Sequence, residues 1–216
     1  MDFIQVEVWV EGDTPLLQHR ATEEALSGRT RQNTPGEAED PRDVCERTIY
    51  RMPDRSIAIP GAAFMRLLRE AGGSHKAKGS RKSLKWLVPA AAIVLDDLCP
   101  LYLKDRRTLI KDFEVDSRPV TIPATKGRVM RHRARFNEWA CRTNLRINTS
   151  ILDEKTIRQL MSEGLAQIGL GDFRPEKGGP FGVSALVSWK IVSDKLAKTP
   201  AQVRNGGTRP DAPPAV

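Results

Sequence analysis

Three stretches of the chain alternate between hydrophobic and polar residues, and each predicts a β-strand with one buried face. They are FIQVEVWVEG at residues 3–12, EWACRTNLRIN at residues 138–148, and a third at about residues 183–192. The residues expected to face the core are Ile4, Val6, Val8 and Val10 in the first stretch, Trp139, Cys141, Thr143, Leu145 and Ile147 in the second, and Ala185, Val187, Trp189 and Ile191 in the third. Shorter strands are expected at Ile57–Ile59 and near Ala91–Leu95.

Two further stretches carry hydrophobic residues at helical spacing. In SIAIPGAAFMRLLREAGG the predicted helix follows Pro60 and ends at two glycines, and in LDEKTIRQLMSEGLAQIG it begins at an N-cap, Asp153. The apolar stripes are Phe64, Leu67, Leu68 and Ala71 in the first helix, and Ile157, Leu160, Met161, Leu165 and Ile168 in the second. Short helices are also expected in TEEALSG and, after an N-cap at Asp40, in DPRDVCERTIY.

The strongest elements follow one another as strand, helix, strand, strand, helix, strand. This βαββαβ order predicts an α+β fold with a ferredoxin-like, RNA-recognition-like (RRM-like) core whose two helices cover one face of the sheet. Two insertions interrupt the order, at residues 12–56 and 97–136, and within the second RPVTIP and GRVMRHRARF predict a hairpin around ATKG. We expect one domain over residues 1–196 and a disordered tail over residues 197–216.

The charge balance narrows the class of partner. The 216 residues include 35 Lys and Arg against 27 Asp and Glu, which gives a net charge of +8. This excess favours a polyanion, nucleic acid first and an anionic membrane surface second, although solvated lysine faces would give the same composition. No stretch approaches the roughly 20 apolar residues of a membrane span, and the N-terminus lacks a signal-peptide pattern. Of the two polyanions, nucleic acid is the expected partner and a membrane is not.

Cysteine and histidine usage argues against disulfide and metal frameworks. Cys45, Cys99 and Cys141 are odd in number and far apart, and they form no CxxC pair, so a reducing cytoplasm is the expected location. The three histidines are scattered without ligand spacing, and no metal site is expected. The chain also lacks GxxxxGK[ST] and a GxGxxG between a first strand and a helix, so no nucleotide cofactor is expected.

A glycine-rich loop, GLGDFRPEKGGPFGVSALVSWK at residues 169–190, leads into the last predicted strand. Glycines permit close approach of the backbone to a ligand, and consecutive backbone N–H groups can form a nest for phosphate oxygens. The candidate phosphate-binding residues are Gly169, Gly171, Arg174, Lys177, Gly178 and Gly179. A long connection whose glycines serve turns is the alternative.

Arginine-rich strands supply further candidates. The hairpin arm carries Lys126, Arg128, Arg131, Arg133 and Arg135, and alternate arginines on a strand are well placed for phosphates. A solvated edge strand protected by charge would have the same pattern. Arg142 and Arg146 alternate with the core residues of their strand, so they belong to the open face of the predicted sheet. A basic loop, HKAKGSRKSLK, is equally consistent with a mobile loop and with direct contact.

The glycine-rich loop resembles the loop that precedes the final strand in the repeat-associated (RAMP) superfamily of CRISPR effector proteins. The stretch IAIPGAAFMRLLREA, from Ile57 to Ala71, is similar to the strand-to-helix entry of the same superfamily. Within it the chain resembles the backbone subunit that polymerises along a guide RNA, with an insertion after the first strand and a hairpin thumb. The resemblance implies a non-catalytic, sequence-independent RNA-binding subunit of a CRISPR-like or phage-encoded ribonucleoprotein. Its partners would be guide RNA, further copies of the chain and other effector subunits.

Two other functions remain open. The resemblance also covers endoribonucleases that process guide RNA, for which His19 and His132 are the candidate acid–base residues, and proteins that cleave a target with an aspartate in the first insertion, where Asp40 and Asp43 lie. A phage single-stranded DNA-binding or annealing protein would use the same basic surfaces. No residue arrangement identifies a catalytic group.

Overall fold

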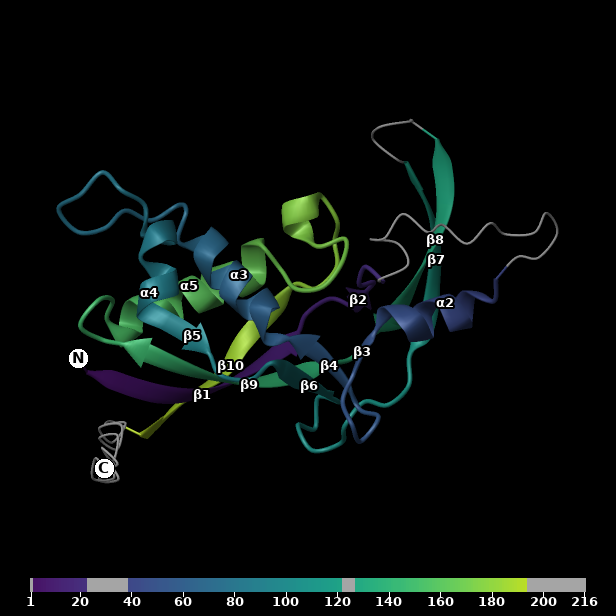
Figure 1. Cartoon of the computed structure of the whole chain (residues 1–216), viewed down its shortest axis with the longest axis horizontal. Coiled ribbons are helices and arrows are strands. Elements are labelled where there is room, and N and C mark those ends of the chain that lie inside the picture. Colours follow the sequence, from purple (N-terminus) through teal and green to yellow (C-terminus); the bar gives the residue numbers. More distant parts are fainter. Residues whose placement is uncertain (1, 23–38, 122–126, 194–216) are drawn as a thin grey trace, which may run out of the picture.

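The computed structural model describes residues 2–22, 39–121 and 127–193 (Figure 1). The strands are β1 (Phe3–Gly12), β2 (Leu16–Gln18), β3 (Tyr50–Arg51), β4 (Ile57–Pro60), β5 (Ala92–Val94), β6 (Leu98–Tyr102), β7 (Glu114–Thr121), β8 (Arg128–Phe136), β9 (Ala140–Asn148) and β10 (Ser184–Ser193). The helices are α2 (Pro41–Thr48), α3 (Gly61–Ala71), α4 (Val88–Ala91) and α5 (Glu154–Gln167), with 3-10 turns η1 (Leu84–Trp86) and η2 (Pro175–Lys177). The fold is mixed α+β with antiparallel sheets, as the sequence predicts.

The larger sheet has seven strands in the order β10-β1-β9-β6-β4-β3, with β5 also pairing with β9. The three alternating strands are neighbours, with β10 at the sheet edge, β1 next to it and then β9; Val6 pairs with Leu145 and Val8 with Thr143. Helices α3, α4 and α5 lie on one face of this sheet, and the opposite face carries no helix among the described residues (Figure 1). The core forms between the sheet and the helices, and the predicted apolar stripes of α3 and α5 supply most of its helical half.

Predicted capping residues begin two of the helices. Asp153 accepts a hydrogen bond from the backbone N–H of Thr156 (2.8 Å) at the start of α5. Asp40 accepts one from the N–H of Arg42 (2.8 Å) at the start of α2. Each cap satisfies a backbone donor that has no partner inside its helix. Both N-cap predictions are confirmed.

Strand β6 was not predicted, because its sequence belongs to the expected second insertion. β5 and β6 share one edge of β9: Val94 pairs with Leu145, whereas Leu101 pairs with Cys141. Between them the side chain of Asp96 accepts a hydrogen bond from the backbone N–H of Asn144 (2.6 Å). This bond takes the place of a backbone hydrogen bond between strands where the pairing with β9 is interrupted. The chain therefore stays on the sheet after β5 for one more strand.

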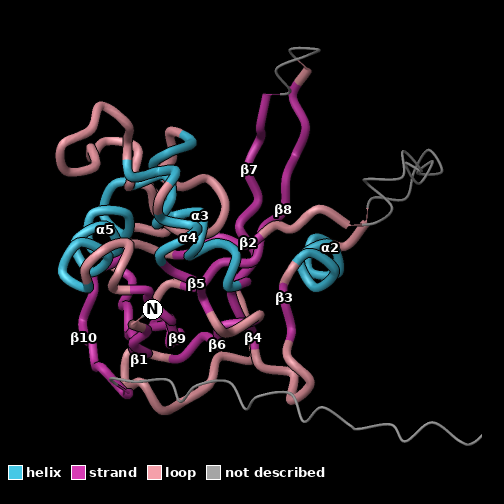
Figure 2. The backbone as a smooth tube through the Cα atoms, turned by 60° about the vertical axis from the view of Figure 1, so that its left-hand side comes forward, coloured by secondary structure: helices cyan, strands magenta, loops and turns pink. Residues whose placement is uncertain are grey.

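The predicted hairpin forms a second, three-stranded sheet in the order β2-β8-β7. It projects away from the main body of the molecule, and α2 lies beside its base (Figure 2). The register pairs Arg131 with Arg118 and Arg133 with Asp116. Strand β7 begins earlier than predicted, and β2 joins the hairpin from the region of the first expected insertion. Lys126, residues 23–38 with most of TEEALSG, and the tail at 197–216 lie outside the described residues.

Three of the four side chains predicted to be buried in the last strand, Ala185, Val187 and Ile191, are exposed. Leu186 pairs with Val10 and Trp189 with Val8, so three residue steps along β10 lie opposite two residue steps along β1. This bulge at Val187 changes which side chains face the core: Leu186 and Trp189 pack against it, whereas Val187 is exposed. A bulge adds one residue to one strand, so simple alternation along the sequence cannot locate the face beyond it.

Gly12 and Trp139 join the two sheets where β1 ends. The N–H of Gly12 donates to the Trp139 carbonyl (2.9 Å), and the fully buried indole donates from Nε1 to the Thr14 carbonyl (2.9 Å). A Cβ on residue 12 would collide with the indole ring. The close approach therefore requires glycine at the end of the strand.

We expect Gly12→Ala to lower the free energy of unfolding by about 1–3 kcal/mol, because overpacking against a rigid buried ring forces neighbouring groups to shift. Urea denaturation measures this change. Asp13→Ala, at the exposed next position, is the matched control and is expected to change stability by less than about 0.5 kcal/mol. Equal effects of the two substitutions would contradict the packing argument.

Candidate nucleic-acid interface

A cleft of about 330 Å³ opens where the start of α3, the glycine-rich loop, the segment after β2 and strand β3 meet. The two segments that carry the RAMP resemblance therefore lie together, although about a hundred residues separate them. The lining residues are Gln18, His19, Arg20, Tyr50, Ile59, Pro60, Ala62, Ala63, Arg66, Gly169, Leu170, Gly171, Asp172 and Arg174. This volume lies within the range of small-molecule sites.

Helix α3 points its N-terminus into the cleft. Its N-cap is Pro60, which makes no side-chain cap, and its first turn has no acidic residue. The N–H of Gly61 donates to the Asp97 carbonyl (2.8 Å), and a Cβ at this position would collide with the Asp96 carbonyl. The next residues, Ala62 and Ala63, line the cleft with small side chains. Uncapped helix N-termini carry partial positive charge and attract anions.

The glycine-rich loop is tightly packed against the rest of the protein. Gly171 has φ of +74°, and a Cβ there would collide with the Leu17 carbonyl; Gly182, at φ +70°, has the same constraint from the Leu170 carbonyl. The N–H groups of Leu170, Asp172 and Gly182 donate to carbonyls of Gly182, Leu17 and Pro15 (2.8–2.9 Å). These three amides are already bonded within the protein, and Gly171 and Gly182 serve close packing. Phosphate binding by Gly169, Gly171, Arg174, Lys177, Gly178 and Gly179 stays a prediction.

Guanidinium groups supply the positive charge of the cleft. Arg66 and Arg174 both pair with Glu176, and Arg174 also donates to the Gly171 carbonyl (2.7 Å). Burial and the nearby Arg66 lower the pKa of Arg174. Arg20 is exposed, with its guanidinium 5.5 Å from the centre of the Tyr50 ring. All three arginines line the cleft, and an entering anion would relieve the repulsion between Arg66 and Arg174.

A buried ion pair joins the hairpin to the glycine-rich loop. Arg133, only 4% exposed, donates from Nε to Asp172 (2.7 Å). Burial raises the pKa of Asp172, but the hydrogen bond and charge of Arg133 outweigh it, so the net pKa lies below the usual range. His19 lies beside this pair and bonds through Nδ1 to the His132 carbonyl (3.1 Å); burial and then Arg131 lower its pKa.

The structure brings only some of the predicted site residues together. Gly169, Gly171 and Arg174 line the cleft, whereas Lys177, Gly178 and Gly179 lie on and after η2, outside the lining. On the hairpin, Arg128 and Arg131 are exposed, Arg133 is buried, and Arg135 donates to Asn137 (2.7 Å). Arg142 and Arg146 lie on the helix-free face of the sheet, where Arg142 is 3.9 Å from Glu7.

Arg20, Tyr50 and Arg66 line the cleft but are not among the residues predicted from the sequence. Arg66 lies five residues after Gly61 in the helix that follows Ile-Pro-Gly. This spacing could have identified it, because side chains in the first two turns of a helix lie near any ligand bound at the helix N-terminus. Arg20 and Tyr50 belong to the first expected insertion and carry no comparable pattern. In the described segments, no group of three or more His, Cys, Asp or Glu residues could hold a metal ion, and no helix is long and apolar enough to cross a membrane.

No protein-family model and no curated protein sequence matches the chain. Solved structures do. A chain of the type III-B Cmr-β structure bound to cognate target RNA aligns with a TM-score of 0.55 and 12% identity over 88% of this chain and 61% of that one. Cmr6 from Pyrococcus furiosus aligns at a TM-score of 0.45 and 8% identity, covering 87% and 100% of the two chains. The first likeness shows a shared fold, and this chain spans about three fifths of that neighbour's length.

We expect Arg133→Met to lower the free energy of unfolding by about 2–3 kcal/mol at pH 7, because it leaves the half-buried Asp172 carboxylate unpaired. Wild-type Asp172 has a lowered pKa, so the stability from this pair is present above the unfolded pKa and is lost as pH falls through the folded pKa. The difference between the proteins should therefore shrink towards acid pH in urea titrations.

Arg131→Met is the control for this experiment, since Arg131 is exposed on the same face of β8. It should change stability by less than about 0.5 kcal/mol. A second variant, Arg133→Met with Asp172→Leu, should recover most of the loss, because neither charge is then left alone. Failure of this double change to recover stability would contradict the assignment of the pair.

Proposed function

We propose that this protein is an RNA-binding subunit of a CRISPR-type ribonucleoprotein, related to the RAMP superfamily. The observation that carries the proposal is the convergence of an uncapped helix N-terminus with Arg20, Arg66 and Arg174 on one cleft. Guanidinium groups suit phosphate because they donate two parallel hydrogen bonds to its oxygens. The fold shared with a chain of the RNA-bound Cmr-β structure supports RNA as the polyanion.

We further propose a ferredoxin-like core for the larger sheet. If β1, β5, β9 and β10 are numbered one to four, their spatial order is four, one, three, two, and every neighbouring pair is antiparallel. Helix α3 follows the first of these strands and α5 follows the third. Strands β3, β4 and β6 then extend one edge of this core, and the hairpin is a projecting addition. The proposed boundaries of one domain over residues 1–196, with insertions at 12–56 and 97–136, follow from the same scheme.

The proposed binding mode is electrostatic and independent of sequence. The exposed Arg20 would contact phosphate directly, whereas Arg66 and Arg174, which share Glu176, would add to the positive potential of the cleft. Arg128 and Arg131 would meet the same strand along the hairpin. Phosphate contacts hold a strand in place without reading its bases, so pairing with a guide would supply specificity. Guide RNA, further copies and other effector subunits are the partners proposed.

One observation favours a second candidate, an endoribonuclease. His19 lines the cleft, and its lowered pKa leaves the imidazole neutral and able to accept a proton at pH 7. Incubation of labelled RNA with wild-type and His19→Ala protein distinguishes the two functions. Cleavage that the substitution abolishes would support the nuclease, and intact RNA with both proteins would support binding alone. Single-stranded DNA gains no support from the structural neighbours, and competition between RNA and DNA oligonucleotides tests it directly.

We expect Arg20→Ala combined with Arg66→Ala to weaken binding of single-stranded RNA by roughly 10- to 100-fold, because each substitution removes a charged hydrogen-bond donor from the cleft. The slope of log affinity against log salt should fall by about 0.7, since Arg20 makes the one direct phosphate contact and each such contact on a single strand contributes about 0.7. Fluorescence anisotropy over a salt series measures both quantities.

The matched control is Lys155→Ala combined with Arg158→Ala, which removes the same two positive charges from exposed positions of α5. It should leave the affinity and the salt slope nearly unchanged. If the control and the cleft variants weaken binding equally, net charge rather than the cleft is responsible, and the proposal is wrong. Unfolding midpoints of all variants guard against loss of fold.

The backbone-subunit form of the proposal predicts assembly along RNA. At low salt the sedimentation coefficient of the complex should rise with the length of a single-stranded RNA, because several copies bind one strand. Analytical ultracentrifugation with RNAs of increasing length measures this. A constant ratio of one protein per RNA would retain RNA binding but exclude polymerisation.

A further inference from the structure

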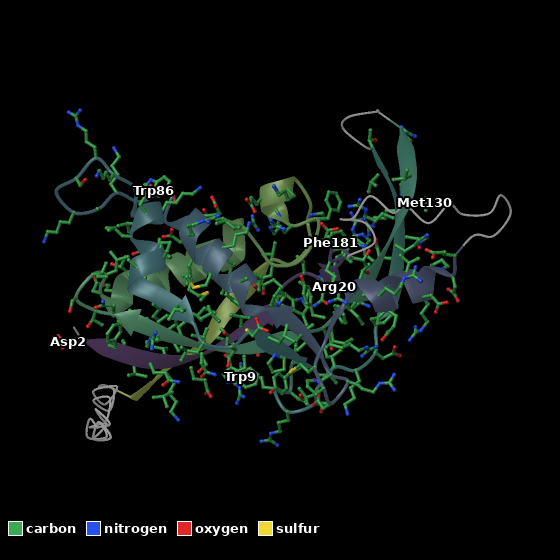
Figure 3. All side chains as sticks on the ribbon, in the orientation of Figure 1. Asp2, Trp9, Arg20, Trp86, Met130 and Phe181 are labelled. Carbon is green, nitrogen blue, oxygen red and sulfur yellow. The ribbon has the colours of Figure 1, made fainter. Side chains whose placement is uncertain are left out.

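Trp86 is the most exposed large hydrophobic side chain in the described segments, at 76%. It lies on the helix-covered side of the molecule, whereas Trp9 lies on the opposite side of the sheet (Figure 3). An indole left in water contributes almost nothing to the core, and large exposed apolar side chains indicate interaction sites when other observations agree. The surroundings of Trp86 supply those observations.

The main chain holds Trp86 outward. It ends η1, whose first residue, Leu84, is buried in the core. The N–H of Leu84 donates to the His75 carbonyl (2.8 Å), and the N–H of Lys85 donates to the Gly72 carbonyl (3.1 Å). The indole is therefore presented by a fixed turn rather than by a free end.

A basic loop, residues 74–83, stands beside this turn. Its exposed cations are Lys76, Lys78, Arg81 and Lys82, and none of them makes an ion pair with any described residue. The loop is ordered by a β-bridge between Lys76 and Ser83 and by a bond from the Ala77 N–H to the Lys82 carbonyl (2.9 Å). By contrast, the basic groups at its base, His75 and Lys85, are paired with acids.

Helix α3 connects this loop to the cleft. The helix begins at the cleft with Gly61 and ends at Ala71, just before the basic loop. Eleven residues at 1.5 Å each place the two ends about 16 Å apart. Both ends lie on the side of the sheet that the helices cover (Figure 1). A single strand of a few nucleotides could span this distance.

We propose that residues 74–86 form a second contact for the same single-stranded RNA, in which Trp86 stacks on a base and the loop cations hold the adjoining phosphates. This contact rests on the proposed function of the cleft. Proteins that bind single strands without sequence preference combine a positively charged track with aromatic rings, because every base has a face on which a ring can stack. Trp86 and the basic loop contain both parts.

The test uses a 15-nucleotide oligouridine and the full-length protein. Trp86→Ala should lower affinity by about 5- to 100-fold, because a stacked base is lost. Trp86→Phe, which retains a ring, should recover most of this loss. Lys78→Ala with Arg81→Ala should lower the salt slope by about 1.4. The control is Ile191→Ala, which shortens an exposed apolar side chain on β10, away from the basic loop, and should bind as wild type.

The outcomes separate this contact from the cleft. If the Arg20 and Arg66 variants lose RNA while Trp86→Ala binds normally, the second contact is refuted and the cleft stands. If Trp86→Ala loses RNA while the cleft variants bind normally, the cleft is refuted and the basic loop is the RNA site. If Trp86→Ala alters only self-association in sedimentation, the surface is a protein contact and the proposal is overturned.

Discussion

The candidate site depends on close packing of the start of helix α3 against the main chain of residues 96 and 97. Gly61 lacks a side chain, so the helix begins in contact with the Asp96 carbonyl and donates its first N–H to Asp97. The main chain of residues 96 and 97 can accept the helix because β5 ends before it and β6 begins after it. The side chain of Asp96 meanwhile accepts a hydrogen bond from Asn144. The interruption of one strand thus decides where the positive end of the helix lies, and the glycine-rich loop packs around it.

The cations of this protein have two different roles. Arg133 braces the hairpin to the loop through Asp172, and Arg174 is bonded to Glu176 and to the Gly171 carbonyl. Such partly buried pairs set geometry and are poorly free to meet a ligand. The exposed groups, including Arg20 and Arg131, are the ones that solvent and ligands reach. A net positive charge is therefore a weak guide to an interface until internal pairs have been separated from exposed cations.

The two faces of the large sheet also differ in what they offer a nucleic acid. On the helix-free face, Trp9 packs on Tyr102 with ring centres 5.1 Å apart. Arg142 lies near Glu7, and Arg146 lies 5.6 Å from the centre of the Phe3 ring. Aromatic and basic groups there contact one another or acids. The unpaired positive charge of the basic loop and the open helix N-terminus both lie on the helix-covered side, which favours that side for binding.

The sequence alone determined the strongest strands and helices and their order, because these depend on local periodicity and capping that neighbouring residues set. Asp153, Asp40 and the apolar stripes of α3 and α5 were all correctly assigned in this way. Tertiary structure decided what involves distant segments: the bulge at Val187 and the place of β6. It also decided which arginines are buried in pairs and how Arg20, Arg66 and Gly171 come to share a cleft. No periodicity records these features, because each arises from a contact between residues far apart in the chain.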